Sequence, residues 1–333
     1  MQALTRPFPE PQYFNHDGLR LAYYEAGDAA DETLILLHGW PEIAYSWAHP
    51  IHALADAGYH VVAPDLRGFG RSDAPHSGGD GGKAHYGIAQ MVGDVEALAD
   101  HLGKARVSVI GHDWGGIITW WAARMLGERV SRVASICTPL VKTAPVDPLK
   151  IFEKRFGTEH YFVVFNREPE WVAELFARDP DAFFRLMFRT VPEDYQMGSA
   201  FTHIPETFAA FLARGAPEVK GAVLSEAQRA VFVEAYGRSG FHGGIALYRN
   251  TTENWELERG LPERFITPAL MVSPEEDRLL PPSVTDHMPG MCAELTRVTI
   301  PRCGHWAMWE RPGEVVRVLV EWLGKTTRAS SRA

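Results

Sequence analysis

The 333-residue chain has few cysteines, no excess of positive charge and no long apolar run, and each lack excludes a class of protein. Its three cysteines, Cys137, Cys292 and Cys303, are too few and too widely spaced for a disulfide framework or a zinc pattern. Lys and Arg number 33 against 42 Asp and Glu, and the net charge of −9 makes nucleic acid a poor partner.

No apolar run reaches the roughly 18 residues that cross a bilayer, and Met1–Asn15 lacks the apolar centre of a signal peptide. We therefore expect a cytoplasmic protein with no membrane span. What the sequence does contain is an ordinary globular composition, 46% hydrophobic and 23% charged, which excludes a disordered chain.

Short apolar runs alternate with helical periodicity in both the first and the last part of the chain. The expected strands are Leu19–Tyr24, Thr33–Leu37, His60–Ala63, Val107–Ile110, Val133–Cys137, Ala269–Ser273 and Leu295–Ile300. The expected helices are Ile51–Ala57, Ile88–Leu102 and Gly313–Leu323. This alternation predicts an α/β fold with a mostly parallel central sheet and helices on both faces.

Helical periodicity, dense in aromatic residues, fills the stretch from Pro139 to Gly260. The clearest helices there are Trp171–Ala177, Ala182–Phe188 and Ser225–Tyr236. The sequence thus predicts an α/β core of residues 1–138 and 261–333, interrupted by an inserted helical cap domain, or lid, of residues 139–260.

The segment Gly111-His112-Asp113-Trp114-Gly115-Gly116 follows an expected strand and opens a helix. This is the context of a nucleophile elbow, a sharp turn that needs small neighbours and presents its middle side chain. Here that side chain is Asp113, where the common version has serine. Asp113 could instead simply cap the helix, but glycines on both sides exceed what a cap requires.

An aspartate at an elbow indicates displacement at a saturated carbon. Its carboxylate is ionised at neutral pH and attacks without the help of a base. Attack on a saturated carbon gives an ester that water can cleave, whereas serine would leave an ether there. Epoxides and alkyl halides are therefore the natural substrates.

Hydrolysis of such an ester needs a base, an orienting acid and an oxyanion hole. His305 follows the last expected strand and is placed to be the base, while Asp277 follows the preceding strand and is placed to be the acid. Glu275 and Glu276 are rivals of Asp277. The order Asp113, Asp277, His305 is that of nucleophile, acid and base in the α/β hydrolases.

Backbone N–H groups build the oxyanion hole in such enzymes. One donor should be Trp114, directly after the nucleophile. The second should be Trp40, in the turn His38-Gly39-Trp40-Pro41 after the Thr33–Leu37 strand.

Four segments carry a family likeness: Gly111–Gly116, His38–Pro41, Asp65–Asp73 and Cys303–Trp306 resemble those of the soluble epoxide hydrolases of the α/β hydrolase fold. The resemblance runs over nearly the whole chain and implies two cap tyrosines that open the oxirane. It places them at Tyr161, in Glu159–Phe165, and at Tyr248, in Leu247–Asn250. The stretch Asp194–Val223 has no counterpart in this resemblance.

A chemical reason for the tyrosines is the leaving group, because epoxide opening releases an alkoxide that needs an acid nearby. A phenol, with a pKa of about 10, can hydrogen-bond the oxygen or protonate it. Tyr195 and Tyr236 are cap rivals, and packing in an aromatic cap also explains each tyrosine.

The leading interpretation is an epoxide hydrolase that converts apolar aryl or alkyl epoxides and water to vicinal diols. The alternative is a haloalkane dehalogenase, which would use the same aspartate, and in which the Trp114 indole could bind halide. Against it, Trp40 offers no side-chain amide for the halide. A non-catalytic receptor on the same fold would not need both His305 and Asp277. Since all attacking groups are protein-borne, no cofactor or metal is implied, and the oligomeric state is left open, a homodimer included.

Overall fold

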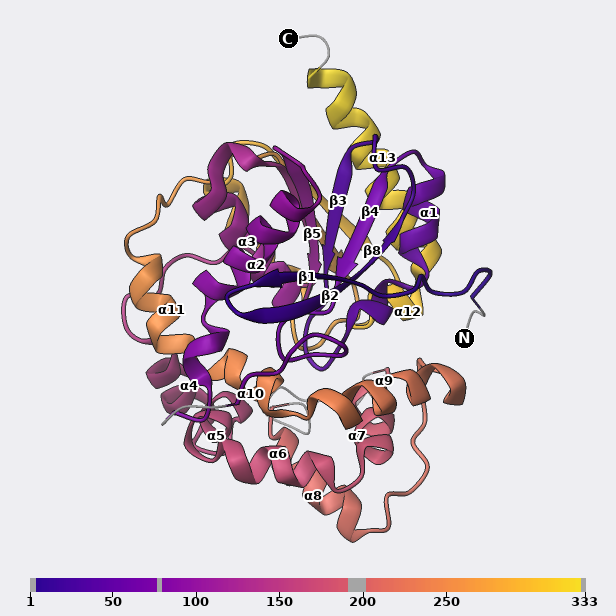
Figure 1. Ribbon diagram of the computed structural model, residues 1–333. Helices are drawn as coiled ribbons and strands as arrows, with labels where there is room; N and C mark the ends of the chain where they lie inside the picture. The colour runs from indigo at the N-terminus through magenta and orange to yellow at the C-terminus, as the bar shows by residue number, and fades with distance from the viewer. Residues whose placement is uncertain (1–3, 77–79, 191–201, 331–333) are drawn as a thin grey trace.

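A central sheet of eight strands organises the protein, in the order β1-β2-β4-β3-β5-β6-β7-β8 (Figure 1). The computed structural model describes residues 4–76, 80–190 and 202–330. The strands are β1 (Gln12–His16), β2 (Leu19–Ala26), β3 (Thr33–Leu37), β4 (His60–Pro64), β5 (Val107–His112), β6 (Val130–Ile136), β7 (Ala269–Pro274) and β8 (Leu295–Ile300).

Strands β3 to β8 run parallel, and β1 and β2 add an antiparallel edge. Every residue of β3, β4, β5 and β7 is buried, as expected of apolar strands covered on both faces. The prediction of a mostly parallel sheet is therefore confirmed. Strand β1 was not among the expected strands, because this edge strand is only half-buried and lacks an apolar run.

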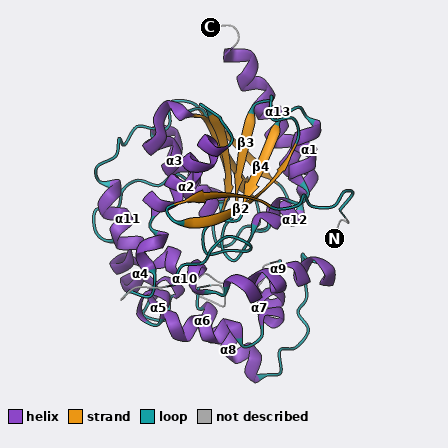
Figure 2. Ribbon diagram, in the orientation of Figure 1, coloured by secondary structure: helices purple, strands orange, loops and turns teal. Residues whose placement is uncertain are grey.

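Helices cover both faces of the sheet (Figures 1 and 2). Leu34 and Leu36 of β3 pack in one buried cluster with α1 (Pro50–Asp56) and α13 (Pro312–Ser330). Ile35 and Leu37 point to the other face, in a cluster with α2 (Ile88–His101) and α3 (Trp114–Leu126). This alternation follows from the two-residue period of a strand. Helix α12 (Ala307–Glu310) precedes α13, which extends beyond its expected end at Leu323 to Ser330.

Helices α4 to α11 form a helical insert between β6 and β7, which we call the cap. It lies below the sheet in Figure 1. Its helices are α4 (Pro148–Phe156), α5 (Tyr161–Arg167), α6 (Pro169–Ala177), α7 (Pro180–Met187), α8 (Ile204–Ala213), α9 (Glu226–Ser239), α10 (His242–Arg249) and α11 (Thr251–Glu258). Helix α8 falls within the stretch 194–223, of which residues 194–201 lie outside the described part of the chain.

Short 3-10 helices punctuate the connections: η1 (Ala44–Trp47), η2 (Lys83–Tyr86), η3 (Gly127–Arg129), η4 (Pro282–Thr285) and η5 (Met288–Gly290). Across the described residues, no helix combines the length and the apolar character that crossing a membrane requires.

Candidate active site

Asp113 lies at the turn between β5 and α3 in a strained backbone conformation, with φ of 53° and ψ of −118°. Small neighbours permit this turn. A Cβ atom at Gly111 would lie 2.0 Å from the carbonyl oxygen of Gly115, and one at Gly115 would lie 2.1 Å from that of Leu37. The side chain of Asp113 makes no capping hydrogen bond to α3, so the turn presents the carboxylate instead of using it as a cap.

One oxygen of this carboxylate is held by the loop after β3. The backbone N–H of Trp40 donates to Asp113 Oδ1 at 2.9 Å, and the Trp40–Pro41 peptide bond is cis. Trp114 is the first residue of α3, and a first-turn N–H has no partner within its helix. The two residues expected to supply oxyanion donors thus flank Asp113.

His305 lies between two carboxylates. Its Nδ1 is 2.8 Å from Asp277 Oδ2, and its Nε2 is 3.8 Å from Asp113 Oδ2. Asp277 Oδ1 also accepts from the backbone N–H groups of Leu279 and Leu280, both at 2.9 Å. The imidazole is therefore aimed at Asp113 by a carboxylate that is itself held by two backbone N–H groups.

Of the three neighbouring acids, the structure brings Asp277 to His305. Asp277 is buried, whereas Glu275 and Glu276 are exposed, and Glu275 accepts from the backbone N–H of Arg302 at 3.0 Å.

Burial and charge act in opposite directions on this pair. Burial disfavours the imidazolium, but the carboxylates of Asp277 and Asp113 outweigh it and raise the pKa of His305 to about 9. Burial also disfavours the charged form of Asp277, yet the proximity of His305 holds the pKa of this carboxyl below its usual value. Both pKa shifts favour the charged forms of this pair, an imidazolium beside the Asp277 carboxylate.

A second buried acid–histidine pair, Glu42 and His112, contacts the backbone of His305. Glu42 Oε2 is 2.7 Å from His112 Nδ1, and His112 Nε2 is 2.8 Å from the carbonyl oxygen of His305. Glu42 also accepts from the N–H of Gly39 at 2.8 Å, next to the Trp40 donor. The sequence analysis did not single out Glu42, although an acid in the otherwise apolar run Trp40-Pro41-Glu42-Ile43-Ala44 is a usable signal.

Tyr161 begins α5, Tyr248 lies in α10, and their ring centroids are 5.3 Å apart. The Tyr248 ring also lies 5.1 Å from that of Trp114, beside the nucleophile. Burial raises the pKa of Tyr248 well above its usual value, and Tyr161 and Asp113 act in the same direction. Tyr248 therefore keeps its phenolic proton, and its hydroxyl can donate a hydrogen bond.

The rival Tyr236 is turned toward the turn after β3, where its hydroxyl lies 3.5 Å from the carbonyl oxygen of Glu42. It is absent from the lining of the cavity that holds Tyr161 and Tyr248. Tyr195 lies outside the described residues.

A cavity of about 200 Å³ joins these groups, since Asp113, Trp114, Tyr161 and Tyr248 all line it. Aromatic rings of the cap form one wall. Phe152 and Phe162 stack with ring centroids 4.3 Å apart, and His160 stacks on Phe152 at 5.1 Å. The sequence analysis did not single out Phe152, because helical periodicity does not distinguish a cavity wall from a packed core.

Comparison with known proteins agrees with this geometry. A family model described as the alpha/beta hydrolase fold matches residues 32–312. Epoxide hydrolase A of Mycobacterium tuberculosis (strain ATCC 25618 / H37Rv) is 34% identical over 319 residues, which are 95% of this chain and 97% of that protein. The chain belongs to the epoxide hydrolases of the α/β hydrolase fold.

Solved structures of epoxide hydrolases share the same architecture. Epoxide hydrolase A from Mycobacterium thermoresistibile superposes with a TM-score of 0.83 at 33% identity, covering 95% of this chain and 98% of that one. Bifunctional epoxide hydrolase 2 of Sus scrofa is 33% identical over 322 residues, or 93% of this chain. Because this match is 54% of the pig protein, the chain spans about half the length of that relative.

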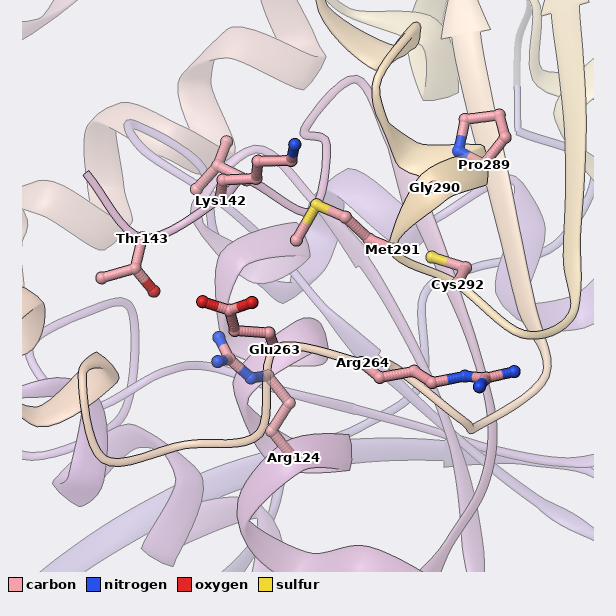
Figure 3. Close-up of a pocket in the computed structure, with 10 residues that line it drawn as sticks. Arg124, Lys142, Thr143, Glu263, Arg264, Pro289, Gly290, Met291 and Cys292 are labelled. Atoms are coloured by element: carbon pink, nitrogen blue, oxygen red, sulfur yellow. The ribbon is translucent and has the colours of Figure 1, made fainter. Parts of the chain in front are cut away.

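This epoxide hydrolase has another cavity, of about 640 Å³, where the cap joins the core (Figure 3). Lys142 and Thr143 on the way into the cap, and Glu263 and Arg264 on the way out, line it together with Arg124 of α3. None of the candidate catalytic residues does, so this cavity is distinct from the one at Asp113.

Proposed function

We propose that this protein hydrolyses epoxides to vicinal diols, with Asp113 as the nucleophile. The observation that carries the proposal is the shared cavity, in which the carboxylate of an elbow aspartate faces two buried tyrosines. The carboxylate supplies the attacking group, and the phenols supply the acid that an alkoxide leaving group requires.

In the first step, a carboxylate oxygen of Asp113 forms a bond to one ring carbon while that carbon's bond to the epoxide oxygen breaks. Tyr161 and Tyr248 hydrogen-bond the epoxide oxygen and deliver a proton to it as negative charge develops. The product of this step is an ester of Asp113 that carries a free hydroxyl on the neighbouring carbon.

In the second step, alkylation has removed the Asp113 charge that favours the imidazolium, so His305 can lose its proton and act as a base. It then takes a proton from water, and the oxygen of that water attacks the carbonyl carbon of the ester. The N–H groups of Trp40 and Trp114 stabilise the resulting oxyanion. Asp277 stabilises the imidazolium. In the collapse, the bond from the former carbonyl carbon to the diol oxygen breaks, that oxygen takes the proton of the added hydroxyl, and the Asp113 carboxylate is restored. The proton on His305 replaces the one that the tyrosine gave to the epoxide oxygen, so both residues return to their starting forms. The hydrogen bond from Trp40 to Asp113 supports this assignment of the hole.

An apolar epoxide bearing an aryl or alkyl group suits the cavity best. Its wall of stacked Phe152, His160 and Phe162 offers flat apolar surface. Burial and the neighbouring His203 lower the pKa of His160 to about 4, so this ring adds no positive charge at neutral pH.

We also infer that the core consists of residues 1–138 and 261–333 and the cap of residues 139–260. The positions of the flanking elements support these bounds: β6 ends at Ile136 and α4 begins at Pro148, while α11 ends at Glu258 and β7 begins at Ala269.

Product analysis tests the proposed function. The purified protein is incubated separately with an aryl epoxide and with a chloroalkane of similar size, and diol and halide are measured. We expect diol without halide release, and no diol from Asp113→Ala. Halide without diol would make the protein a dehalogenase, in which Trp114 at the cavity could bind the halide. Full diol formation by Asp113→Ala would overturn the role of Asp113.

A further inference from the structure

Three potential metal ligands from distant parts of the chain meet outside the active site. His76 lies on the core loop between β4 and α2, Glu170 is in the first turn of α6, and His242 begins α10. The ligand atoms of these residues all lie within 4.8 Å of one another. Helix α10 packs against both α6 in the cap and η2 in the core, which explains how the three side chains are brought together.

Glu170 lies at a ligand-like distance from each imidazole of this cluster. Glu170 Oε2 is 3.5 Å from His76 Nε2 and 3.4 Å from His242 Nδ1. An N–H···O hydrogen bond is usually about 2.9 Å long. In a tetrahedral zinc site with bonds of about 2.0–2.1 Å, neighbouring ligand atoms are about 3.3–3.4 Å apart.

The chemistry of the three groups also suits such an ion. Two imidazoles and one carboxylate form a ligand set that zinc uses, and it favours zinc-like transition metals over Mg²⁺ or Ca²⁺. The imidazole rings lie 3.8 Å apart, centroid to centroid, which is closer than two rings bonded to one tetrahedral ion, so the side chains turn apart when an ion binds.

The surroundings supply both signs of charge. Glu170 and Glu174 favour a cation beside His242, while Arg249 opposes it. The side chains of His76, Glu170 and His242 are 42%, 56% and 33% exposed, so an ion can enter from solvent and keep water ligands.

A second His-rich group among the described residues, His112, Cys137 and His305, is already engaged. Both ring nitrogens of His112 have partners in Glu42 and the His305 carbonyl, and Nδ1 of His305 is held by Asp277. The cluster of His76, Glu170 and His242 differs. Among the described residues, the ring contacts and ion pairs of its two imidazoles are with each other and with the Glu170 carboxylate.

We propose that His76, Glu170 and His242 bind a zinc-like divalent transition metal that joins the cap to the core. One ligand comes from the core and two come from the cap, so the bound ion adds a link between two parts of the chain that already meet through packing and through hydrogen bonds such as that from the Asn250 side chain to the carbonyl oxygen of Lys83. An ion that binds this folded arrangement stabilises it in proportion to the logarithm of its concentration.

Calorimetric titration of the tag-free, chelator-treated protein with Zn²⁺ tests the site. We expect about one ion per chain, and a loss of Zn²⁺ affinity of more than tenfold in His76→Ala and in His242→Ala. Removing a residue that only hydrogen-bonds to a metal ligand already lowers metal affinity by about tenfold or more, and these residues would be ligands themselves. The matched control is His52→Ala, which removes a half-buried imidazole of α1 that bonds the carbonyl oxygen of Pro7. Its affinity should equal that of the parent.

Thermal unfolding gives a second readout that needs no substrate. Zn²⁺ should raise the Tm of the parent and of His52→Ala, but not that of His242→Ala, and Mg²⁺ should have no effect on any of them. Absence of zinc binding by the parent would overturn the proposal, as would undiminished affinity in both His76→Ala and His242→Ala.

Discussion

Nε2 of His305 lies 3.8 Å from Oδ2 of Asp113, too far for a hydrogen bond yet directly beside the carboxylate. The proposed base is thus held next to the proposed nucleophile without forming a hydrogen bond to it. With the roles proposed above, Asp113 is free to attack first, and His305 acts afterwards on the ester that Asp113 becomes.

Oxygen labelling should reveal that ester. In a single turnover with excess enzyme in H₂¹⁸O, we expect a diol without label, because its new oxygen comes from Asp113 and the water oxygen stays on the enzyme. Repeated turnover should label the diol. Mass spectrometry of the product distinguishes this route from direct attack by water, which would label the diol in the first turnover.

The pH dependence of ester hydrolysis follows from the charges around His305. The pKa of His305 is about 9 in the resting site because Asp277 and Asp113 outweigh burial. Alkylation removes the Asp113 charge, so the midpoint for hydrolysis of the ester should lie below pH 9, and the rate should rise with pH through it. Single-turnover rates across pH check this, and a midpoint at or above 9 would contradict it.

Asp277→Asn is the matched variant for that experiment. It removes the carboxylate that orients His305 and stabilises the imidazolium, so hydrolysis of the ester should slow by about 10²–10⁴-fold. The midpoint should also shift to lower pH. A slow variant with an unmoved midpoint would mean that Asp277 acts only by packing.

The same raised pKa links the stability of the fold to pH. The charged His305 stabilises the folded state most fully below its unfolded pKa of about 6.5, and this contribution is lost as pH rises through about 9. The parent should therefore lose stability relative to His305→Gln as the pH rises from about 6.5 to about 9, so the difference between their free energies of unfolding should become smaller over this range. Urea titrations at several pH values measure it, and a constant difference would speak against the assignment.

Removing the phenolic hydroxyls should slow alkylation. We expect about tenfold for Tyr161→Phe or Tyr248→Phe alone, and about 10²–10⁴-fold for the double variant, because an acid in the transition state contributes in that range. Tyr236→Phe is the control, since this buried cap tyrosine does not line the cavity. Stopped-flow measurement gives the rate of ester formation. Equal rates in the double variant and the control would mean that Tyr161 and Tyr248 serve only in packing.

The glycines of the elbow should be irreplaceable. Gly111→Ala places a Cβ 2.0 Å from a backbone oxygen that cannot move away cheaply, and we expect a loss of several kcal/mol in the free energy of unfolding, roughly 3 or more. Gly237→Ala in α9 meets nothing within 4 Å and should stabilise the protein by about 0.5–1 kcal/mol. Chemical denaturation compares the two variants.

Local pattern was enough to predict the sheet and the elbow. Strands such as β3 are apolar along their whole length because both faces are covered, and Asp113 stands out among its glycines. Strand β1 was missed because it forms a half-exposed edge. Short cap helices such as α5 and α10 span too few turns to show a clear period.

Contacts between distant residues could not be predicted in this way. Glu42 meets His112 across 70 positions, and His242 meets His76 through the docking of the cap. No recurring spacing in the sequence indicates either pair, because each contact depends on how whole helices and loops pack together. The choice of Asp277 over its neighbours likewise needed the position of the His305 ring.

The candidate catalytic groups are divided between two parts of the chain, the core and the cap that is inserted into it. Asp113, Asp277 and His305 lie on loops of the sheet, while Tyr161 and Tyr248 belong to cap helices α5 and α10. With the proposed roles, ring opening needs both parts, whereas release of the product needs only the first. Mutations in the cap can therefore change which bond is broken and leave the proposed hydrolytic groups of the core unchanged.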